Sequence, residues 1–559
     1  MSAPSTRPRR KFWGWGREGE GLSPAEREGL LERAGKRWGS ALAERRPVPP
    51  PEEGEIELRA PRVELPSALA ADLGDAVSTI AHERLVHSYG KSFPDALRAF
   101  QRHYPEPPDL VVTPRDEAQI ERLLEWCGEQ GVAVVPFGGG SSVVGGVESA
   151  VRGDYRGVVS LDLGRLDRVL EVDRTSRAAR IQAGVLGPAL EAQLQPHELT
   201  LRHFPQSFEH STLGGWIATR SGGHFASLYT HIDDLVESVR AVTPAGVWES
   251  RRLPGSGAGP SPDRLLIGSE GILGVITEAW MRLQDRPRHR ASSSAWFESF
   301  EAGAEAVRAL SQSGLFPSNC RLIDAAEAAA TGVGDGERHL LVLGFESGDH
   351  PVEAWMRRAL ELVAGHGGAV PQRPDADQGP DAPRDAAAGA WRHAFLRAPY
   401  AREVLVPYGV IVDTFETAVT WDRFPEVHAA LMARTAEALR EATGRDGSVT
   451  CRFTHVYPDG PAPYYTFQVL GDADLAVVLR QWCEIKRACN AAVAELGATA
   501  THHHAVGRDH RSAYDRQRPE PFALALGAAK AAVDPHGVLN PGVLIDVPDR
   551  GAGGGGILG

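Results

Sequence analysis

The chain has 559 residues and a mass of 60.1 kDa, and its 60 basic and 73 acidic side chains give a formal net charge of −13. A hydrophobic content of 42% with 24% charged residues is ordinary for a globular protein and excludes a mostly disordered chain. The negative charge argues against a general nucleic-acid-binding protein, because a surface that follows phosphates needs excess Lys and Arg. Since single hydrophobic cores stop growing near roughly 250–300 residues, we expect two or three domains.

Cysteine usage and apolar runs restrict the compartment. The five cysteines have no CxxC spacing, which excludes a disulfide framework and a zinc ribbon and is typical of a reducing compartment. No apolar run reaches the roughly 18–20 residues that cross a bilayer, and no apolar signal core follows the basic residues from Arg7 to Lys11. We therefore expect a cytoplasmic protein. Residues 546–559 are rich in glycine and are expected to form a flexible tail.

Residues 1–105 are expected to form an N-terminal helical region. A helix is predicted from Pro24 to about Arg46, because Ser23 and Glu26 have the spacing of a capping box just before it. The residues alone do not indicate what this region does.

The next region, from about residue 106 to residue 286, combines strands with helices. Its first unit is a strand at 110–112, a helix over 116–130 and a strand at 132–136. The last strand runs directly into a glycine-rich loop, which indicates an α/β unit with a turn made for close backbone approach. Further strands are predicted at 158–161, 169–172, 179–182, 236–242 and 274–283, with a helix at 187–194.

A third region, residues 287–545, alternates apolar strands such as 340–345 and 410–415 with Ala-rich helices. Residues 367–388 are rich in Pro, Asp and Ala and are expected to form an exposed loop. The mixture of strands and helices in both large regions predicts an α+β fold.

Three segments of the middle region combine glycines with hydroxyl side chains. Consecutive glycines allow backbone N–H groups to converge on an anion, and the hydroxyls add donors for phosphate oxygens. One such loop is weak evidence, since ordinary tight turns have the same composition, and the first loop matches neither GxxxxGK[ST] nor GxGxxG. Three in one domain favour an extended dinucleotide: Pro136-Phe-Gly-Gly-Gly-Ser-Ser142, residues 205–223 and residues 267–277.

The order of these motifs resembles that in FAD domains of the vanillyl-alcohol-oxidase type. The stretches that carry the resemblance are PFGGGSSV, PQSFEHSTLGGWIATRSGG and GSEGILGVITEA. Within that superfamily the chain is most similar to the alkyldihydroxyacetonephosphate synthases, a family of ether-lipid flavoenzymes, over about residues 13–545. The more specific stretches are Trp13-Gly-Trp-Gly16, Arg321-Leu-Ile-Asp324, Phe415–Arg423, Cys451–His455 and Thr501–Gly507.

The resemblance implies a vanillyl-alcohol-oxidase-type FAD-binding domain over 106–286 and a substrate, or cap, domain over 287–545 whose last segment returns to the flavin. It also implies non-covalent FAD, with the pyrophosphate along residues 136–142. The expected cofactor-binding residues are Pro136, Phe137, Gly138, Gly139, Gly140, Ser141, Ser142, Gln206, Ser207, Ser211, Thr212, Thr219, Arg220, Ser221, Gly222, Glu270, Gly271, Ile272, Leu273, Gly274, Val275 and Ile276.

A triplet of histidines is the most informative candidate for catalysis. On an extended segment, His502 and His504 would point to one face and His503 to the other. Three imidazoles can transfer protons near neutral pH or hold an anionic substrate. No second cluster completes a metal shell, so we expect no metal; a solvated polar loop is the alternative. The resemblance places His502 where hydroxy-acid dehydrogenases carry Glu, and Ala505 where the synthases carry Gly.

Two further candidates depend on the resemblance. Tyr464 falls at the position of an active-site tyrosine of the synthases, where it could act as an acid or base. Its competitor is Tyr465, which would face the other way on a strand, and either could be a core aromatic. Arg402, in Tyr400-Ala-Arg-Glu-Val-Leu405, falls at the position of an arginine that faces substrate and flavin. A guanidinium offers a planar fork to a substrate phosphate.

The reaction implied by the resemblance replaces the acyl group of acyl-dihydroxyacetone phosphate by a long-chain fatty alcohol and releases a fatty acid. The exchange has no net oxidation, and the flavin is expected to act covalently. Arg402 would hold the phosphate, Tyr464 and His503 would move protons, and His502 and His504 would support them. The competing function is an FAD-dependent oxidase or dehydrogenase of a 2-hydroxy acid such as D-lactate or glycolate, which has the same fold.

The long chains of these substrates also motivate a hypothesis of peripheral membrane contact. The basic residues from Arg7 to Lys11, with Phe12, Trp13 and Trp15, could touch an anionic surface. The alternative is a leader that packs on the core. A homodimer is left open, and no nucleic-acid partner is expected.

Overall fold

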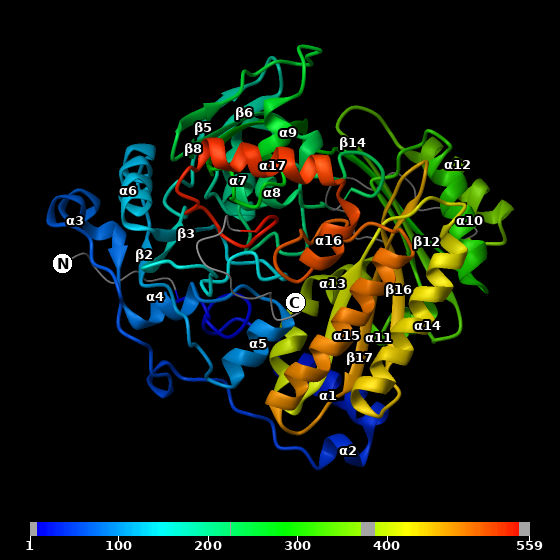
Figure 1. The fold of residues 1–559 in the computed structure, drawn as a ribbon. Coiled ribbons are helices and arrows are strands. Elements are labelled where there is room, and N and C mark those ends of the chain that lie inside the picture. Colours follow the sequence, from blue (N-terminus) through cyan, green and yellow to red (C-terminus); the bar gives the residue numbers. More distant parts are fainter. Residues whose placement is uncertain (1–7, 224, 371–385, 547–559) are drawn as a thin grey trace.

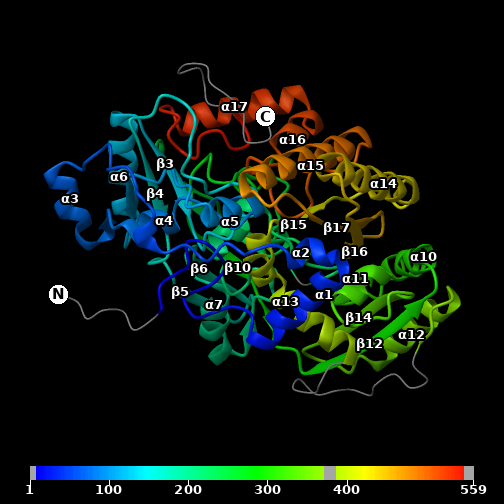
Figure 2. The same cartoon turned by 90° about the horizontal axis from the view of Figure 1, so that it is seen from below.

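The computed structural model describes residues 8–223, 225–370 and 386–546. Two halves, each built around its own sheets, lie next to each other in the ribbon (Figure 1). Each half has its own large apolar core. The N-terminal residues run along one side of the molecule and reach both halves (Figure 2).

The first half contains a four-stranded sheet and a five-stranded sheet. In the four-stranded sheet, of order β1-β2-β4-β3, the last three strands are parallel. Their continuous apolar runs suit strands that are covered on both faces. The five-stranded sheet, β5-β6-β10-β8-β9, is antiparallel, and β11 pairs with β7. The strands are β1 (Val77–Ser78), β2 (Leu110–Val112), β3 (Val132–Phe137), β4 (Gly157–Asp162), β5 (Val169–Asp173), β6 (Ala178–Gln182), β7 (Leu199–Thr200), β8 (Val236–Thr243), β9 (Gly246–Glu249), β10 (Val275–Arg282) and β11 (Gln284–Asp285).

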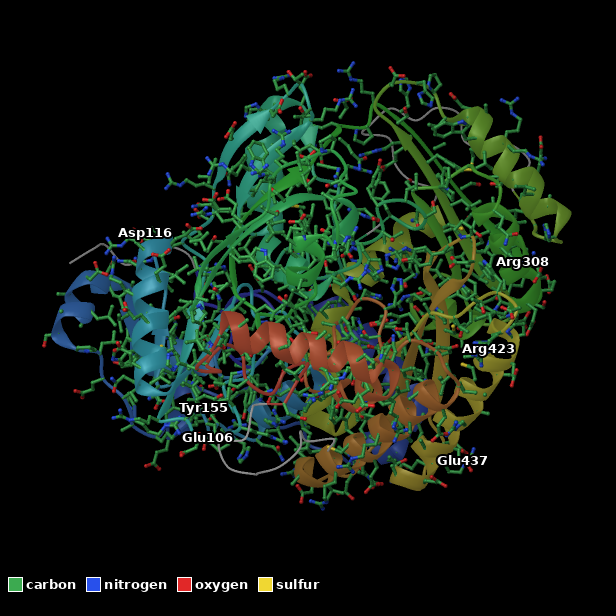
Figure 3. The ribbon with its side chains drawn as sticks, turned by 45° about the horizontal axis from the view of Figure 1, so that its top comes forward. Glu106, Asp116, Tyr155, Arg308, Arg423 and Glu437 are labelled. Atoms are coloured by element: carbon green, nitrogen blue, oxygen red, sulfur yellow. The ribbon has the colours of Figure 1, made fainter. Side chains whose placement is uncertain are left out.

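Capping residues define the main helix of this half. Helix α6 (Glu117–Gln130) begins after Asp116, whose carboxylate accepts the Gln119 N–H, and ends at Gly131 in the left-handed conformation. Asp116 lies at the opposite edge of the molecule from Arg308 of the second half (Figure 3). The other helices of this half are α7 (Gly187–Leu194), α8 (Leu213–Thr219) and α9 (Pro262–Leu266).

The second half is built on one six-stranded antiparallel sheet of order β12-β14-β13-β16-β17-β15. Helices α10, α12 and α14 lie on its outer side (Figure 1). The strands are β12 (His289–Phe297), β13 (Asn319–Ile323), β14 (His339–Ser347), β15 (Val410–Glu416), β16 (Ser448–Val456) and β17 (Pro461–Leu470). The helices are α10 (Phe300–Ser311), α11 (Ala325–Ala330), α12 (Glu353–Gly365), α13 (Ala386–Leu405), α14 (Phe424–Thr443) and α15 (Leu475–Glu495).

The C-terminal segment returns to the first half. Helices α16 (Arg511–Gln517) and α17 (Glu520–Val533) follow α15, and α17 ends at the β8–β9 turn, where the Ala245 N–H donates to the Val533 carbonyl. A bridge between Val134 of β3 and Leu539 then joins the last described residues to the four-stranded sheet. Leu539 and Val543 belong to the apolar core of that half. This return places residues 501–507 between the two sheet systems, because they connect α15 to α16.

The N-terminal residues contribute to both halves. Helix α1 begins after Ser23, with the predicted capping box to Glu26, and packs with Leu405 and Leu470 of the second half. Later residues such as Leu73 join the core of the first half. The remaining helices of this region are α2 (Ser40–Ala43), α3 (Ser67–Leu73), α4 (Ala81–Val86) and α5 (Phe93–Phe100), with α1 spanning Pro24–Trp38. The predicted boundaries at 105, 286 and 545 stay predictions.

Two predicted elements differ from the structure. The helix predicted to reach Arg46 ends at Trp38, because Gly39 has a φ of 52° and interrupts it before the short α2. The predicted loop 367–388 falls mostly on residues 371–385, which lie outside the described residues, and α13 already begins at Ala386. The predicted tail also lies outside them, except for residue 546.

The segment expected to touch a membrane is packed against the protein instead. Phe12 and Trp15 are only 8% and 7% exposed. The Lys11 ammonium lies 2.8 Å from the Glu403 carboxylate of α13, which also accepts the Trp15 N–H. The structure therefore favours the alternative of a leader on the core, with Arg7 outside the described residues. Within the described ranges, the helices are too short or too polar to cross a bilayer.

Candidate active site

A cavity of about 760 Å³ lies where the two halves and α1 meet. One wall comes from the glycine-hydroxyl segments of the first half, and the other from the sheet and helices of the second. The predicted cofactor-binding residues that line it are Gly138, Gly139, Gly140, Ser141, Ser142, Gln206, Ser207, Ser211, Thr212, Thr219, Ser221 and Gly222. The predicted catalytic residues that line it are Arg402, Tyr464, His503 and His504. Two sets of residues predicted separately thus share one cavity.

The glycine loop after β3 is held tightly against the second segment. A Cβ at Gly139 would collide with the His210 carbonyl oxygen, and one at Gly138 with the Thr212 hydroxyl. Among the described residues, the backbone N–H groups of Gly139, Gly140 and Ser141 have no hydrogen-bond acceptor. Unpaired, partly buried N–H groups that converge beside a cavity form a cradle for an anion. The loop therefore fits the pyrophosphate of FAD.

The third glycine segment has a different position from the one expected. Pro136, Phe137 and Arg220 do not line the cavity, and neither do Glu270, Gly271, Ile272, Leu273, Gly274, Val275 and Ile276. Ile272 to Ile276 belong to the apolar core. The Glu270 carboxylate accepts the N–H groups of Val506 and Gly507 at 2.9 and 2.8 Å, and burial raises its pKa to about 7. This residue anchors the histidine segment to the first half, and its assignment to FAD stays a prediction.

The histidine triplet adopts a bent segment and not an extended one. His503 and His504 both line the cavity, whereas His502 lies behind them with its Nε2 2.8 Å from the Tyr457 hydroxyl. The predicted alternation of faces was therefore wrong, because residues 502–504 form bends between α15 and α16. Burial, followed by the neighbouring imidazoles, lowers the pKa of His502 and of His503 well below the usual value. His503 is thus neutral at pH 7 and can accept a proton.

A carboxylate that the sequence analysis did not select holds this bend. Glu416, at the end of β15, accepts the backbone N–H groups of His502, His503 and His504 and the Thr501 hydroxyl. Burial alone would raise its pKa, but the imidazoles and the Thr501 hydroxyl lower it to about 2. Its only sequence signal was its place in the Phe415–Arg423 stretch. An ionised carboxylate with three N–H donors fixes the backbone that carries the triplet.

Three imidazoles also form a cluster behind the cavity wall. Ring nitrogens of His455, His502 and His503 lie within 4.8 Å of one another. Several of these nitrogens already have partners: His502 Nδ1 is 3.0 Å from His503 Nδ1, and His455 Nε2 is 3.0 Å from the Gly223 carbonyl. The cluster is thus held by hydrogen bonds within the protein. The expectation of no metal site stays a prediction.

Tyr464 and Tyr465 occupy opposite faces of β17. Tyr464 lines the cavity, with its ring 5.8 Å from that of His503 and its hydroxyl donating to Thr414 at 3.1 Å. Tyr465 is fully buried on the other face, where its hydroxyl is 3.2 Å from His428. Burial raises the pKa of Tyr464 above its usual value, so the phenol keeps its proton at pH 7. Tyr464 can therefore donate a proton or a hydrogen bond into the cavity once its hydroxyl turns away from Thr414.

Arg402 lines the cavity, but its guanidinium already has partners. Its Nη2 lies 2.6 Å from the Asp413 carboxylate, and its Nη1 donates to the Lys91 carbonyl at 3.1 Å. Asp413 is buried, and its pKa is lowered by nearby Lys486 and Arg402 despite that burial. The charge of Arg402 is thus matched inside the protein, and its fork is largely occupied.

Two arginines of the same wall escaped the residue-by-residue reasoning. Arg321 of β13 and Arg452 of β16 line the cavity and are 2% and 8% exposed. Both stood in stretches quoted only for their resemblance. Because the chain has so many arginines, its composition does not indicate which of them are buried. The pairing of β13 with β16 is what reveals these two.

Ala505 has the unusual backbone that the sequence analysis raised as a question. Its φ is 73°, in the left-handed region that favours glycine. The substitution of Gly by Ala therefore does not prevent this conformation, but it introduces strain next to the histidine triplet.

Comparisons with known proteins agree with this geometry. Residues 108–250 match the family described as an FAD binding domain, and residues 286–544 match the C-terminal domain of FAD linked oxidases. The chain is 29% identical over 488 residues to an alkyldihydroxyacetonephosphate synthase of Trypanosoma brucei brucei, which covers 85% of this chain and 79% of that protein. The synthase of Dictyostelium discoideum is 28% identical, with coverage of 83% and 77%.

Solved structures give the same result. A structure titled alkyldihydroxyacetonephosphate synthase has a TM-score of 0.76 at 25% identity and covers 95% of this chain and 98% of that one. The chain is an FAD-dependent enzyme that is similar over most of its length to the alkyldihydroxyacetonephosphate synthases. This flavoenzyme also shares its fold with p-cresol methylhydroxylase, at a TM-score of 0.65 and 17% identity over 86% of this chain and 96% of that one. It is 26% identical to the glycolate oxidase subunit GlcD of Bacillus subtilis, with coverage of 82% and 92%.

Proposed function

We propose that this flavoenzyme exchanges the acyl group of acyl-dihydroxyacetone phosphate for a long-chain alcohol. The bond between the substrate carbon and the acyl oxygen breaks, and a bond from that carbon to the alcohol oxygen forms. The fatty acid leaves as a carboxylate, and the alcohol proton is taken up by the protein or by water, so that no net oxidation occurs. FAD, when bound, supplies the covalent chemistry at the substrate carbon.

The observation that carries this proposal is the apolar arm of the cavity. Beyond the glycine loop and Tyr464, the cavity continues between α1, α11 and α13. Its small and aliphatic lining side chains are Leu22, Ala25, Leu30, Ala326, Ala330, Ala394, Ala398 and Leu405, and charged side chains such as Glu26, Arg33, Arg37 and Arg397 line the same stretch. An acyl or alkyl chain gains free energy by burial in such a channel, at about 0.8 kcal/mol for each buried CH₂. A 2-hydroxy acid of two or three carbons would leave it without a function.

Acid and base roles follow from the protonation states. His503 is neutral at pH 7 and faces the cavity, so we assign it the removal of the alcohol proton. Tyr464 keeps its proton and donates toward the substrate. His504 faces the same space, and His502 supports the two through its hydrogen bond to His503. Arg402 is held at the cavity wall by Asp413 and by the Lys91 carbonyl.

The competing function is oxidation of a 2-hydroxy acid such as D-lactate or glycolate, which the similarity to the glycolate oxidase subunit keeps open. One pair of assays separates the two. Purified, FAD-loaded protein is incubated with acyl-dihydroxyacetone phosphate and labelled hexadecanol, and the labelled ether product is counted. In parallel, D-lactate or glycolate is added without oxygen and the flavin absorbance is followed. We expect labelled ether without bleaching; bleaching without ether would assign the oxidase function instead.

Membrane contact and location belong to the same proposal. Arg33 and Arg37 of α1 are exposed and also line the cavity, so its apolar arm opens to solvent near α1. We propose that this opening faces an anionic membrane from which the chains enter, with the protein otherwise cytoplasmic. Sedimentation with anionic liposomes should weaken for Arg33→Glu/Arg37→Glu and stay unchanged for Arg174→Glu, an exposed arginine in the β5–β6 turn that does not line the cavity. Equal pelleting of the three proteins would reject the proposed membrane contact.

A homodimer stays a prediction, testable by sedimentation equilibrium.

A further inference from the structure

Arg321 and Arg452 form a buried pair on neighbouring strands of the cavity wall. Strands β13 and β16 pair at Ile323 and Arg452, which brings Arg321, two residues before Ile323, onto the same side of the sheet. Both guanidinium groups reach the cavity. Leu322, the next residue of β13 after Arg321, points to the opposite face of the sheet and belongs to the apolar core there. The pair therefore presents two positive charges to the cavity and almost none to bulk solvent.

The charges around this pair do not balance it. Arg452 contacts Glu327, with 2.5 Å between Nη1 and Oε1, and its guanidinium lies 4.0 Å above the centre of the Tyr464 ring. Arg321 lies over the rings of Trp391 and Phe395 at 4.8 and 5.1 Å. Nε and Nη1 of Arg321 have no hydrogen-bond partner among the described residues, and neither has Nε of Arg452. One carboxylate thus faces two guanidinium groups.

A further carboxyl group, that of Asp324, is directed at the backbone, and no hydrogen bond or ion pair joins it to either arginine among the described residues. Asp324 accepts the backbone N–H groups of Glu327 and Cys451, and burial raises its pKa to about 7. The pKa of Arg321 is lowered to about 9 by burial and by the adjoining Arg452, which still leaves the group charged at pH 7. Buried charged groups are normally paired, because desolvation of an isolated charge is expensive. An unpaired guanidinium at a cavity wall indicates a ligand with complementary charge.

The position of the two arginines in the cavity indicates which anion they bind. The pyrophosphate cradle lies in the other half, along Gly139 to Ser141. Arg452 instead stacks on Tyr464, the residue assigned to the substrate. Two guanidinium groups that line one cavity match the several oxygens and double charge of a phosphate monoester better than the single charge of a carboxylate.

Resting on the proposed function, we propose that Arg321 and Arg452 bind the phosphate of acyl-dihydroxyacetone phosphate and so align its reacting carbon with Tyr464. This replaces Arg402 in that role, because the Arg402 fork is occupied by Asp413 and the Lys91 carbonyl. The fatty-acid carboxylate is the other anion of the reaction, and it is an outcome of the test.

Calorimetric titration of the FAD-loaded protein tests the assignment. Dihydroxyacetone phosphate, uncharged dihydroxyacetone and hexadecanoate are the three probes. Arg321→Met keeps the length and the contact with Trp391 but removes the charge. We expect it to weaken binding of dihydroxyacetone phosphate about 10–100-fold, with hexadecanoate unchanged. Flavin absorbance per protein should equal that of the parent. In the exchange assay, KM for acyl-dihydroxyacetone phosphate should rise more than kcat falls.

Further variants separate the loss of a charge in the cavity from a structural defect. Arg452→Met would leave Glu327 buried without its partner, so it is combined with Glu327→Gln, and this double variant should show the same loss. Arg321→Lys should be intermediate, because it keeps the charge without the planar fork. Arg338→Met is the matched control, since half-buried Arg338 lies 5.2 Å over Trp296, pairs with Asp335 and does not line the cavity. Its affinity for all three probes should match the parent.

Three results would overturn the inference. Unchanged affinity for dihydroxyacetone phosphate in Arg321→Met, while the parent catalyses the exchange, rejects the inference and leaves the proposed function standing. A selective loss of hexadecanoate binding would assign the pair to the leaving carboxylate. A parent protein that binds no dihydroxyacetone phosphate and forms no ether rejects the proposed function and the inference together.

Discussion

The two walls of the cavity are built from different chemical groups. The wall of the first half presents backbone N–H groups and hydroxyls, held in place by glycines such as Gly138 and Gly139 that admit close neighbours. The wall of the second half presents titratable and charged side chains, whose states depend on burial and on each other. The fixed backbone groups of the first wall suit a cofactor, because the same cofactor takes part in every turnover. The second can differ between flavoenzymes of one fold, which is where specificity for a substrate belongs.

The largest expected effect concerns the backbone wall. Gly139→Val should abolish flavin binding, because its Cβ would meet the His210 carbonyl oxygen and force the loop away from the second segment. Flavin binding is thus lost for two reasons: the new side chain collides with the protein, and it occupies space that the pyrophosphate needs. Flavin absorbance per protein after dialysis against FAD measures it. Gly255→Ala, at an exposed glycine with no atom within 4 Å of the new methyl group, should stay fully yellow. A yellow Gly139→Val protein would contradict the cradle.

Next come the acid and base of the other wall. Tyr464→Phe and His503→Ala should each lose roughly 10²–10⁴-fold in exchange activity while they keep their flavin. The double variant should be little worse than either, because groups that act on one substrate as a unit are not additive. Tyr465→Phe, one residue away on the opposite face, should stay close to the parent. If Tyr465→Phe were the inactive variant, the assignment of Tyr464 would be wrong by one position.

Glu416→Gln tests the support of the histidine bend. Its pKa lies near 2 in the folded protein against an ordinary 4.5, so the ionised form stabilises the fold at pH values above 4.5. That contribution should be lost as the pH falls from 4.5 to about 2. The parent should therefore lose more stability over this range in urea unfolding than Glu416→Gln does. Glu301→Gln, on the outer helix α10, serves as control; the same pH dependence in all three proteins would contradict the assigned role.

The smallest expected effect is at Ala505. Ala505→Gly should stabilise the protein by up to about 1 kcal/mol, because glycine adopts the φ of 73° without strain, partly offset by the greater freedom of the unfolded chain. Ala500→Gly, at a residue outside the left-handed region, should destabilise instead. Thermal unfolding of the three proteins measures both signs. A lower Tm for Ala505→Gly would show that the methyl group makes contacts worth more than the strain.

Sequence reasoning predicted the backbone wall better than the side-chain wall, and the reason is physical. Gly138 to Gly140 are consecutive in the sequence. A backbone that must approach other atoms closely requires glycine at that position, so the requirement can be recognised from the local sequence alone. Most strands around them were also predictable, since β3 and β4 are short apolar runs. The third glycine segment shows the limit, because Gly271 and Gly274 serve packing and Glu270 anchors Val506 and Gly507.

The side-chain wall depends on contacts across long sequence separations. Glu416 holds residues 86 to 88 positions later, and Arg452 pairs with Glu327, 125 positions earlier. Neither pairing has a local pattern, so composition and periodicity could not select these residues. The bend at 502–504 escaped for the same reason, because Glu416 and Glu270 fix it from two different halves. Tyr464 was selected only through the resemblance, and its place beside Arg452 follows from the pairing of β16 with β17.

The leader that packs on α13 has a consequence for the order in which the protein assembles. Lys11 and its partner Glu403 are 392 residues apart in the chain. At a synthesis rate of roughly 5–20 residues per second, the leader leaves the ribosome about 20–80 seconds before α13 exists. Until then the Lys11 ammonium and the Trp15 N–H lack the carboxylate that holds them, and the side of the cavity that α1 and α13 close stays open. The glycine wall is completed later still, because Leu539, which is made after α13, pairs with Val134 of the strand that leads into the glycine loop. Both walls of the cavity are therefore finished only when nearly the whole chain has been made.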